Sequence, residues 1–206
     1  PRIKAVMGSL PEMAAADAES REDLLAEAAQ PEAIAAREQM KAMFDLMDNE
    51  EVAPSAGLKI STHEFTSAPD GNTIKIQLIR PTSDTAVPCV YYIHGGGMMT
   101  MSAFDGMYRA WGKIIAAQGV AVAMVDFRNA LEPSSTPEVE PFPAGLNDCT
   151  PGLRWVVATS ATLGIAAAHV PVAADWRAGS TARPTGRRPH PSVPLWLPPA
   201  LPRPPP

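Results

Sequence analysis

Few cysteines and no long, uninterrupted apolar run occur in this chain of 206 residues. Its two cysteines, Cys89 and Cys149, make no disulfide framework and have no metal-ligand spacing, so we expect two buried thiols in a reducing, cytoplasmic setting. The first 20 residues contain no apolar segment of the kind that directs secretion. The apolar run at 119–125 is far below the ~20 residues that cross a bilayer, and the stretch at 156–174 is interrupted by polar residues and a proline. No membrane partner is therefore expected.

Acidic residues are almost absent from the end of the chain, whereas proline is concentrated there. Residues 171–206 contain eleven of the 23 prolines, five arginines and one acid, while residues 1–170 contain 21 acidic and 12 basic residues. Nucleic-acid binding requires clustered Lys and Arg, so the acidic body argues against a nucleic-acid partner. A Pro- and Arg-rich segment cannot bury a core, and we expect residues 166–206 to form a disordered tail.

Two helices are predicted between residues 12 and 48, where Ala, Glu, Leu, Met and Gln dominate. Ser20 with Asp23 forms an N-terminal capping signal for the first helix, and Pro31 suits the opening turn of the second. The second helix has one apolar face that we expect to dock on the rest of the chain, formed by Ile34, Met40, Met43, Phe44 and Met47. Residues 1–57 are thus predicted to form a helical N-terminal unit.

An α/β core is predicted at residues 58–165, because strand and helix patterns alternate along this part of the chain. Continuous apolar strands indicate a sheet covered on both faces, with parallel members. The predicted elements are an antiparallel strand pair at 58–65 and 73–80 around an Asp70-Gly71-Asn72 turn, a strand at 87–93, a helix from Asp105 to Gly119, a strand at 120–127, and a helix at 142–163 that Pro151 should kink.

A run of three glycines, His94-Gly95-Gly96-Gly97, directly follows the strand at 87–93. Glycines let backbone N–H groups approach a ligand oxygen without interference from Cβ atoms, so the run indicates an oxyanion hole. A phosphate-binding loop is a competing interpretation, but no Gly-Lys-Ser/Thr and no G-x-G-x-x-G is present. A plain glycine-rich turn is the other alternative.

Several separated motifs, in a fixed order, resemble the hormone-sensitive-lipase-like esterases of the α/β-hydrolase fold. The resemblance runs from about residue 50 to residue 165. It rests on the segment 88–98 with its Tyr-Tyr-Ile-His-Gly-Gly-Gly core, on Val125-Asp126-Phe127-Arg128, on Pro141-Phe142-Pro143-Ala144 followed by Asp148, and on Asp70-Gly71 and Arg80-Pro81. It implies the N-terminal half of an α/β-hydrolase sheet, preceded by cap helices.

By this resemblance the chain is a carboxylic-ester hydrolase of the serine esterase and lipase type, acting on small esters without a metal or organic cofactor. The backbone N–H groups of Gly96 and Gly97 would stabilise the oxyanion, and His94 and Gly95 would shape the loop.

Methionines near the glycine run are candidates for the apolar lining of the ester pocket. Met98 and Met99 are predicted to contact substrate, and the helices before residue 50 to form part of a cap over the acyl pocket. For Met40, Met43 and Met47, packing in the core is the alternative to lining that pocket.

No catalytic nucleophile or base can be identified, because the chain contains no G-x-S-x-G. Ser180 lies in Ala178-Gly179-Ser180-Thr181-Ala182, without the second glycine, and the candidate bases His63, His169 and His190 have no supporting motif. Without a nucleophile the tetrahedral intermediate does not form, so we expect the chain to be truncated before the elbow and inactive. A shift of reading frame near residues 165–175 is our hypothesis for the tail.

An open sheet edge is the predicted structural consequence. The strand at 87–93 would lack its outer neighbour, and Pro171 should make pairing by residues 166–174 poor, because proline has no N–H. We therefore expect low solubility or a partly molten chain.

An interaction protein is the alternative function. Residues 188–194 match the basic-x-x-P-x-x-P pattern that polyproline-binding grooves accept. Completion of the half-sheet by self-association, giving a homo-oligomer, is a further open alternative.

Overall fold

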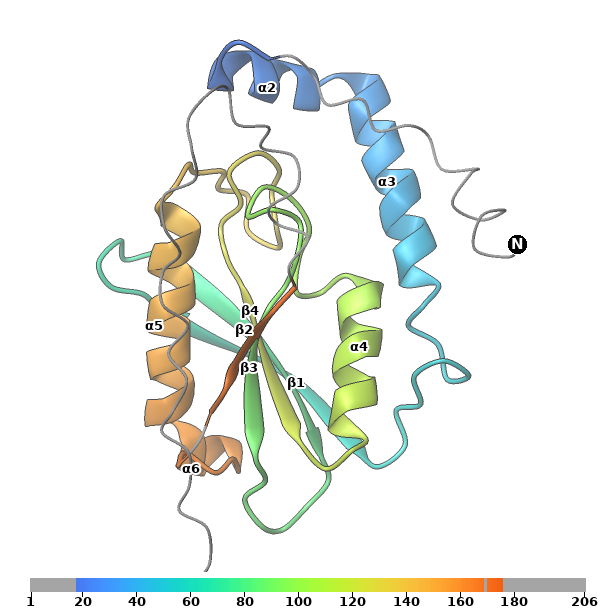
Figure 1. Ribbon diagram of the computed structural model, residues 1–206, viewed down its shortest axis with the longest axis vertical. Helices are drawn as coiled ribbons and strands as arrows, with labels where there is room; N and C mark the ends of the chain where they lie inside the picture. Colours follow the sequence, from blue (N-terminus) through green and yellow to red (C-terminus); the bar gives the residue numbers. More distant parts are fainter. Residues whose placement is uncertain (1–17, 169, 176–206) are drawn as a thin grey trace, which may run out of the picture.

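The computed structural model describes residues 18–168 and 170–175 as one mixed sheet with helices on both faces (Figure 1). In chain order its elements are α2 (Arg21–Ala28), α3 (Pro31–Asp45), β1 (Leu58–Thr66), β2 (Thr73–Pro81), β3 (Cys89–Ile93), α4 (Gly106–Ala116), β4 (Ala121–Asp126), α5 (Ala144–Ala158), α6 (Ser160–Leu163) and β5 (Val172–Ala174). None of the helices in the described ranges is long and apolar enough to cross a membrane.

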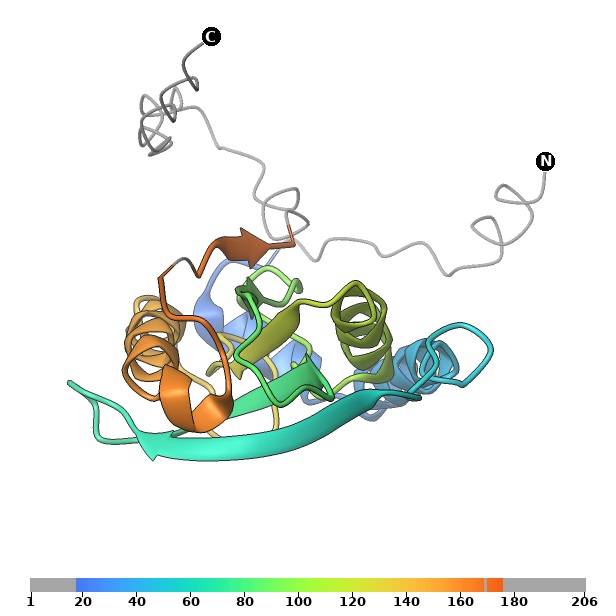
Figure 2. The same cartoon turned by 90° about the horizontal axis from the view of Figure 1, so that it is seen from below.

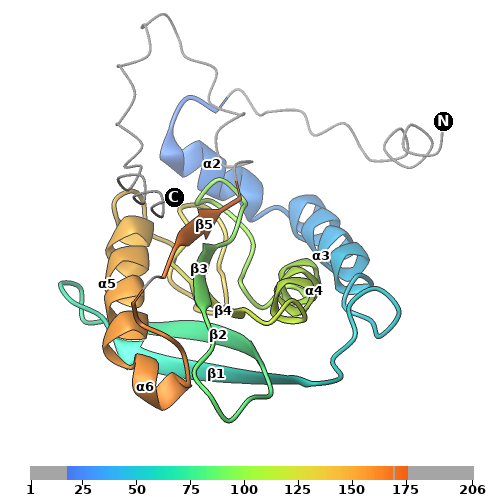
Figure 3. The ribbon, with the colours of Figure 1, turned by 60° about the horizontal axis from the view of Figure 1, so that its bottom comes forward.

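The strands are ordered β1-β2-β4-β3-β5 across the sheet (Figure 3). β1 and β2 form the predicted antiparallel hairpin, and β2 is also antiparallel to β4. β3 runs parallel to both β4 and β5, so the predicted parallel members are confirmed. Seen from below, the β1–β2 hairpin lies along one side of the molecule and β5 lies on the opposite side (Figure 2).

Two helices cover opposite faces of the sheet, with α5 on one side and α4 on the other (Figure 1). Under α5 the core is built around Tyr91, Val125 and Phe127, and under α4 around Tyr92 and Met124. All six residues of β4 are buried, which explains the unbroken apolar pattern of this strand. The sequence pattern thus placed this strand correctly at the centre of a two-sided core.

A buried ion pair joins α5 to the end of β4 and to the β1–β2 turn. The Asp148 carboxylate on α5 accepts hydrogen bonds from the backbone N–H of Arg128 at 2.8 Å, from its Nε at 2.9 Å and from its Nη2 at 2.8 Å. Asn72 donates to the same carboxylate at 3.0 Å, and Asp70 accepts from Arg128. These contacts fix the start of α5 against the sheet.

The helix after β4 differs from the prediction at both ends. α5 begins at Ala144 rather than 142 and continues through Pro151. The break falls at Thr159, which separates α5 from the short α6.

The N-terminal helices begin where the sequence predicts. The Ser20 hydroxyl accepts the Asp23 N–H at the start of α2, and Pro31 opens α3. The apolar face of α3 docks only in part: Met40 and Phe44 are half-buried, whereas Met43 is 40% exposed and no residue of α3 is fully buried. Polar contacts also hold α3. Asp45 accepts the Gly106 N–H at 2.8 Å, and the same helix forms the ion pairs Lys41–Asp105 and Arg37–Glu132.

The predicted open edge of β3 is wrong, because β5 pairs with it. The Tyr91 N–H donates to the Pro171 carbonyl at 2.9 Å, and the Asp175 N–H donates to the Ile93 carbonyl at 3.2 Å. Pro171 contributes an acceptor, so the N–H that it lacks does not prevent the strand from forming. The sheet therefore continues into residues that the sequence assigned to the tail.

Candidate functional site

The glycine run lies at the carboxyl end of β3, in a loop whose backbone conformation needs glycine. Gly96 has φ of 99° and Gly97 has φ of 72°, both in the left-handed region. A Cβ atom on Gly96 would collide with the carbonyl oxygen of Thr100. The carboxyl ends of parallel strands are the usual place for ligands in α/β sheets, so this loop is the candidate site.

Hydrogen bonds fix the loop while leaving two donors without a partner. The Gly95 N–H donates to the Tyr108 hydroxyl at 2.9 Å. The Gly96 carbonyl accepts from the N–H groups of Met99 at 3.0 Å and Thr100 at 3.1 Å. Among the described residues, no acceptor faces the backbone N–H of Gly96 or Gly97. The arrangement can therefore offer two N–H groups to an oxygen.

His94 is a buried side chain behind this loop rather than a group facing solvent. Its ring stacks on Phe127, with centroids 4.2 Å apart and planes within 7°, and its Nδ1 lies 2.8 Å from the Gly95 carbonyl. Burial lowers the pKa of His94, against the opposing effect of Asp126. In the neutral ring Nδ1 carries the proton, because a carbonyl oxygen can only accept. His94 thus holds the Gly95 carbonyl.

A pocket of about 290 Å³ opens beside the glycine loop. Of the two predicted substrate contacts, Met98 lines this pocket, and its methyl group lies against Gly145 of α5. Met99 does not line it; its carbonyl accepts the N–H groups of Leu131 and Glu132. The lining residues are Gly97, Met98, Arg128, Ala130, Glu140, Phe142, Gly145 and Leu146.

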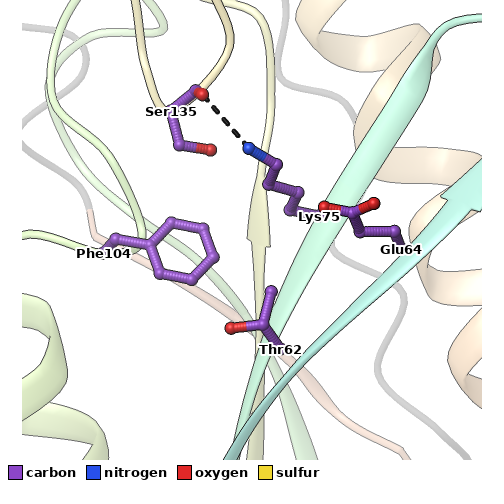
Figure 4. Close-up of a pocket in the computed structure, with 5 residues that line it drawn as sticks. All are labelled: Thr62, Glu64, Lys75, Phe104 and Ser135. Atoms are coloured by element: carbon purple, nitrogen blue, oxygen red, sulfur yellow. Dashed lines mark hydrogen bonds between the residues drawn. The ribbon is translucent and has the colours of Figure 1, made fainter.

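A second, more open pocket of about 220 Å³ lies on the β1–β2 hairpin (Figure 4). Glu64 and Lys75 face each other across the two strands, and Lys75 donates to the Ser135 carbonyl at 3.2 Å. Phe104 and Thr62 complete the lining. No residue of the glycine loop lines this pocket.

Neither the two cysteines nor the Ser61–His63 contact lies in the glycine loop. Burial raises the pKa of Cys89 to about 11 and that of Cys149 to about 12, which keeps both thiols protonated and unreactive. The sequence analysis missed a Ser–His contact, in which Ser61 Oγ lies 2.9 Å from His63 Nε2. Both residues are on β1, the outer strand at the far side of the sheet, and His63 packs beside Trp155.

Strand β5 is the strand beside the glycine loop that the sequence analysis missed. In a nucleophile elbow, a strand of the sheet leads directly into the turn that carries the serine. Here β5 occupies the place next to β3, and Asp175 and Trp176 follow it in the sequence. The signal was the short apolar run Val172-Ala173-Ala174, which was obscured by Pro171 directly before it and by the alanines at 166–168. The candidates Ser180, His169 and His190 lie outside the described residues.

Known proteins match a large part of this chain. The family model described as BD-FAE matches residues 76–179, about half of the chain. Among solved structures, esterase Est22 is 57% identical with a TM-score of 0.82, over 84% of this chain and 51% of Est22. Brefeldin A esterase, described as a bacterial homologue of human hormone-sensitive lipase, is 28% identical with a TM-score of 0.63, over 84% of this chain and 46% of that structure.

A sequence relative is also an esterase by name. Carboxylesterase NlhH of Mycobacterium tuberculosis is 35% identical over 96 residues, which are 46% of this chain and 27% of NlhH. The chain thus spans about half of Est22 and about a quarter of NlhH. The predicted resemblance is confirmed: the chain belongs to the BD-FAE family, it is similar to hormone-sensitive-lipase-like esterases of the α/β-hydrolase fold, and its partial coverage of them fits an N-terminal part.

Proposed function

We propose that this chain carries the oxyanion-stabilising half of a carboxylester-hydrolase site, with small carboxylic esters as its ligands. The observation that carries the proposal is the pair of backbone N–H groups at Gly96 and Gly97, which have no acceptor among the described residues and lie at the carboxyl end of β3. The names of Est22, brefeldin A esterase and NlhH support ester substrates for proteins of this kind.

In this proposal the loop acts on the charge that develops when an ester carbonyl becomes tetrahedral. Two fixed N–H donors bind the resulting oxyanion more strongly than the neutral carbonyl oxygen, which lowers the barrier to its formation. Tyr108 and His94 hold Gly95, so the donors need no rearrangement during the reaction. Loss of one such donor in a complete enzyme costs about 2.7–4 kcal/mol of transition-state stabilisation.

We further propose that this polypeptide alone is catalytically incomplete. It contains no G-x-S-x-G, and the two residues after β5 are Asp175 and Trp176, neither of which supplies a hydroxyl. Bond cleavage requires a nucleophile and a base to form and resolve the tetrahedral intermediate. The loop can thus stabilise the anion but cannot create it.

The oxyanion function is tested by NMR titration with ethyl methylphosphonate, a tetrahedral anion that resembles the intermediate of an ethyl ester. We expect the amide protons of Gly96 and Gly97 to shift on binding. Gly71 and Gly119, which share a positive φ but lie in remote turns, provide matched controls. Equal shifts at all four glycines, or none at Gly96 and Gly97, would refute the proposed function.

Catalytic incompleteness is tested with 4-nitrophenyl acetate and a fluorophosphonate probe. We expect background hydrolysis and no covalent labelling. Robust hydrolysis that disappears in Gly96→Pro, together with a labelled serine, would show that the chain supplies its own nucleophile.

The interaction alternative stays a prediction, because residues 188–194 lie outside the described residues. Capture of the chain by SH3-type domains, abolished by Pro191→Ala, is the result that would favour it.

A further inference from the structure

Asp126, the last residue of β4, touches both ends of the loop that contains the glycine run. Its carboxylate is fully buried. Oδ1 accepts hydrogen bonds from the Ser102 hydroxyl and from the Ala103 N–H, each at 2.8 Å, and lies 3.9 Å from Nε2 of His94. The loop begins at His94 and returns at Ser102, so one oxygen atom lies beside its entry and its exit.

The other oxygen of the same carboxylate serves a different segment. Oδ2 accepts the Ser135 N–H at 2.9 Å. Ser135 belongs to the chain between β4 and α5, which also supports the glycine loop, since the Ala130 N–H donates to the Met98 carbonyl at 2.9 Å. The two oxygens of Asp126 therefore have separable partners.

The glycine loop needs such support because its backbone is strained. Besides Gly96 and Gly97, the non-glycine residues Met98 and Met101 have positive φ values of 58° and 75°. Backbone of this kind costs free energy at each position and persists only where the surroundings hold it. A buried carboxylate provides strong, charge-assisted hydrogen bonds for this purpose.

We propose that Asp126 is a positioning residue for the oxyanion hole: through Ser102 and Ala103 it closes the loop, and this fixes the direction of the Gly96 and Gly97 N–H groups. The claim that the loop binds an oxyanion rests on the proposed function. The claim that Asp126 closes the loop rests on the contacts of its Oδ1, and it can be tested without measuring ester hydrolysis.

Hydrogen exchange of three variants tests the closure. Asp126→Ala removes both acceptors, whereas Asp126→Asn keeps its carbonyl oxygen for Ser102 and Ala103 and turns an NH₂ group toward Ser135. Asp148→Asn is the matched control, since Asp148 is equally buried and accepts four hydrogen bonds, but none of them from the glycine loop.

In Asp126→Ala we expect the amides of Gly95, Met99 and Thr100 to exchange about tenfold faster or more, because bonds to a charged acceptor are lost. In Asp126→Asn these amides should keep their protection while the Ser135 amide loses it. If Asp126→Ala does not fold, the proposal is tested by Asp126→Asn alone, through the difference in protection between the loop amides and the Ser135 amide. Loop opening that is as large in Asp148→Asn as in Asp126→Ala, measured relative to the amides of β4, would overturn the proposal. Equal loss at the loop and at Ser135 in Asp126→Asn would also overturn it.

A second readout links the closure to the oxyanion. The ethyl methylphosphonate shifts at Gly96 and Gly97 should vanish in Asp126→Ala and persist in Asp126→Asn. If the unmodified chain shows no such shifts but the exchange pattern holds, the proposed function fails and the positioning by Asp126 stands. If the shifts persist unchanged in folded Asp126→Ala, Asp126 does not position the donors.

Discussion

Gly96 illustrates how one residue type can be required by both conformation and space. Its φ of 99° disfavours any side chain, and a Cβ atom there would also collide with the Thr100 carbonyl. Gly71 has a comparable φ of 74° but no atom within 4 Å of a Cβ position. The two glycines therefore separate the conformational cost of alanine from the steric cost.

We expect Gly71→Ala to lower the free energy of unfolding by about 1–2 kcal/mol, the cost of left-handed backbone for a residue with a Cβ. Gly96→Ala should lower it by about 1–3 kcal/mol more, because overpacking adds to that cost. Urea unfolding of both variants measures the difference. Equal losses of free energy of unfolding in the two variants would mean that the loop accommodates the Cβ atom at residue 96 without a steric cost.

At this same scale, the sequence predicted the glycines but not the positions of the side chains around them. A run of three glycines after an apolar strand indicates close approach to a ligand, whatever the rest of the fold. By contrast, the positive φ values of Met98 and Met101 go with hydrogen bonds from distant residues: Ala130 donates to the Met98 carbonyl and Asn129 to the Met101 carbonyl. Such long-range hydrogen bonds leave no local pattern in the sequence.

At the scale of secondary structure, α5 is held against the sheet by an ion pair as well as by its apolar face. Arg128 and Asp148 are paired out of water, and the hydrogen bond to Asp148 raises the pKa of Arg128, so the guanidinium stays charged. Removing the Asp148 charge leaves the guanidinium of Arg128 with the partly exposed Asp70 as its remaining ion-pair partner. That situation costs more than the loss of an exposed ion pair.

We expect Asp148→Asn to lower the free energy of unfolding by about 1.5–3 kcal/mol, because hydrogen bonds to a buried charge are weakened while Asp70 still pairs with Arg128. Lys41→Met, which breaks the exposed Lys41–Asp45 pair within α3 and the longer pair with Asp105, should cost less than about 1 kcal/mol. Urea denaturation of the two variants provides the comparison. A loss in Asp148→Asn no larger than that in Lys41→Met would show that α5 is held by its apolar contacts alone.

Element prediction succeeded where a pattern was long and failed where it was short. β4 and the β1–β2 hairpin have continuous or alternating runs of at least six residues, which specify burial directly. β5 has three residues and lies beside Pro171, so its local signal is that of a loop. It becomes a strand because β3 offers it an unpaired edge, which is a tertiary effect.

For the molecule as a whole, β5 moves the exposed sheet edge rather than removing it. The carbonyl of Pro171 and the N–H of Asp175 face β3, and strand residues alternate in direction, so the backbone groups of Val172 and Ala174 face away from the described sheet. Val172 is also 51% exposed. An apolar edge of this kind can pair with another chain.

The last prediction concerns self-association through the β5 edge. From the sequence we expected low solubility or a partly molten chain, whereas the structure points to association at one specific surface. We expect the chain to associate as its concentration rises, and Val172→Lys to reduce this, because a charge on an edge strand opposes strand pairing. Val157→Lys is the matched control, since Val157 is 40% exposed but lies on α5. Sedimentation velocity over a concentration series measures the effect. Equal loss of association in both variants would assign it to general apolar exposure, and unchanged association in Val172→Lys would exclude the β5 edge.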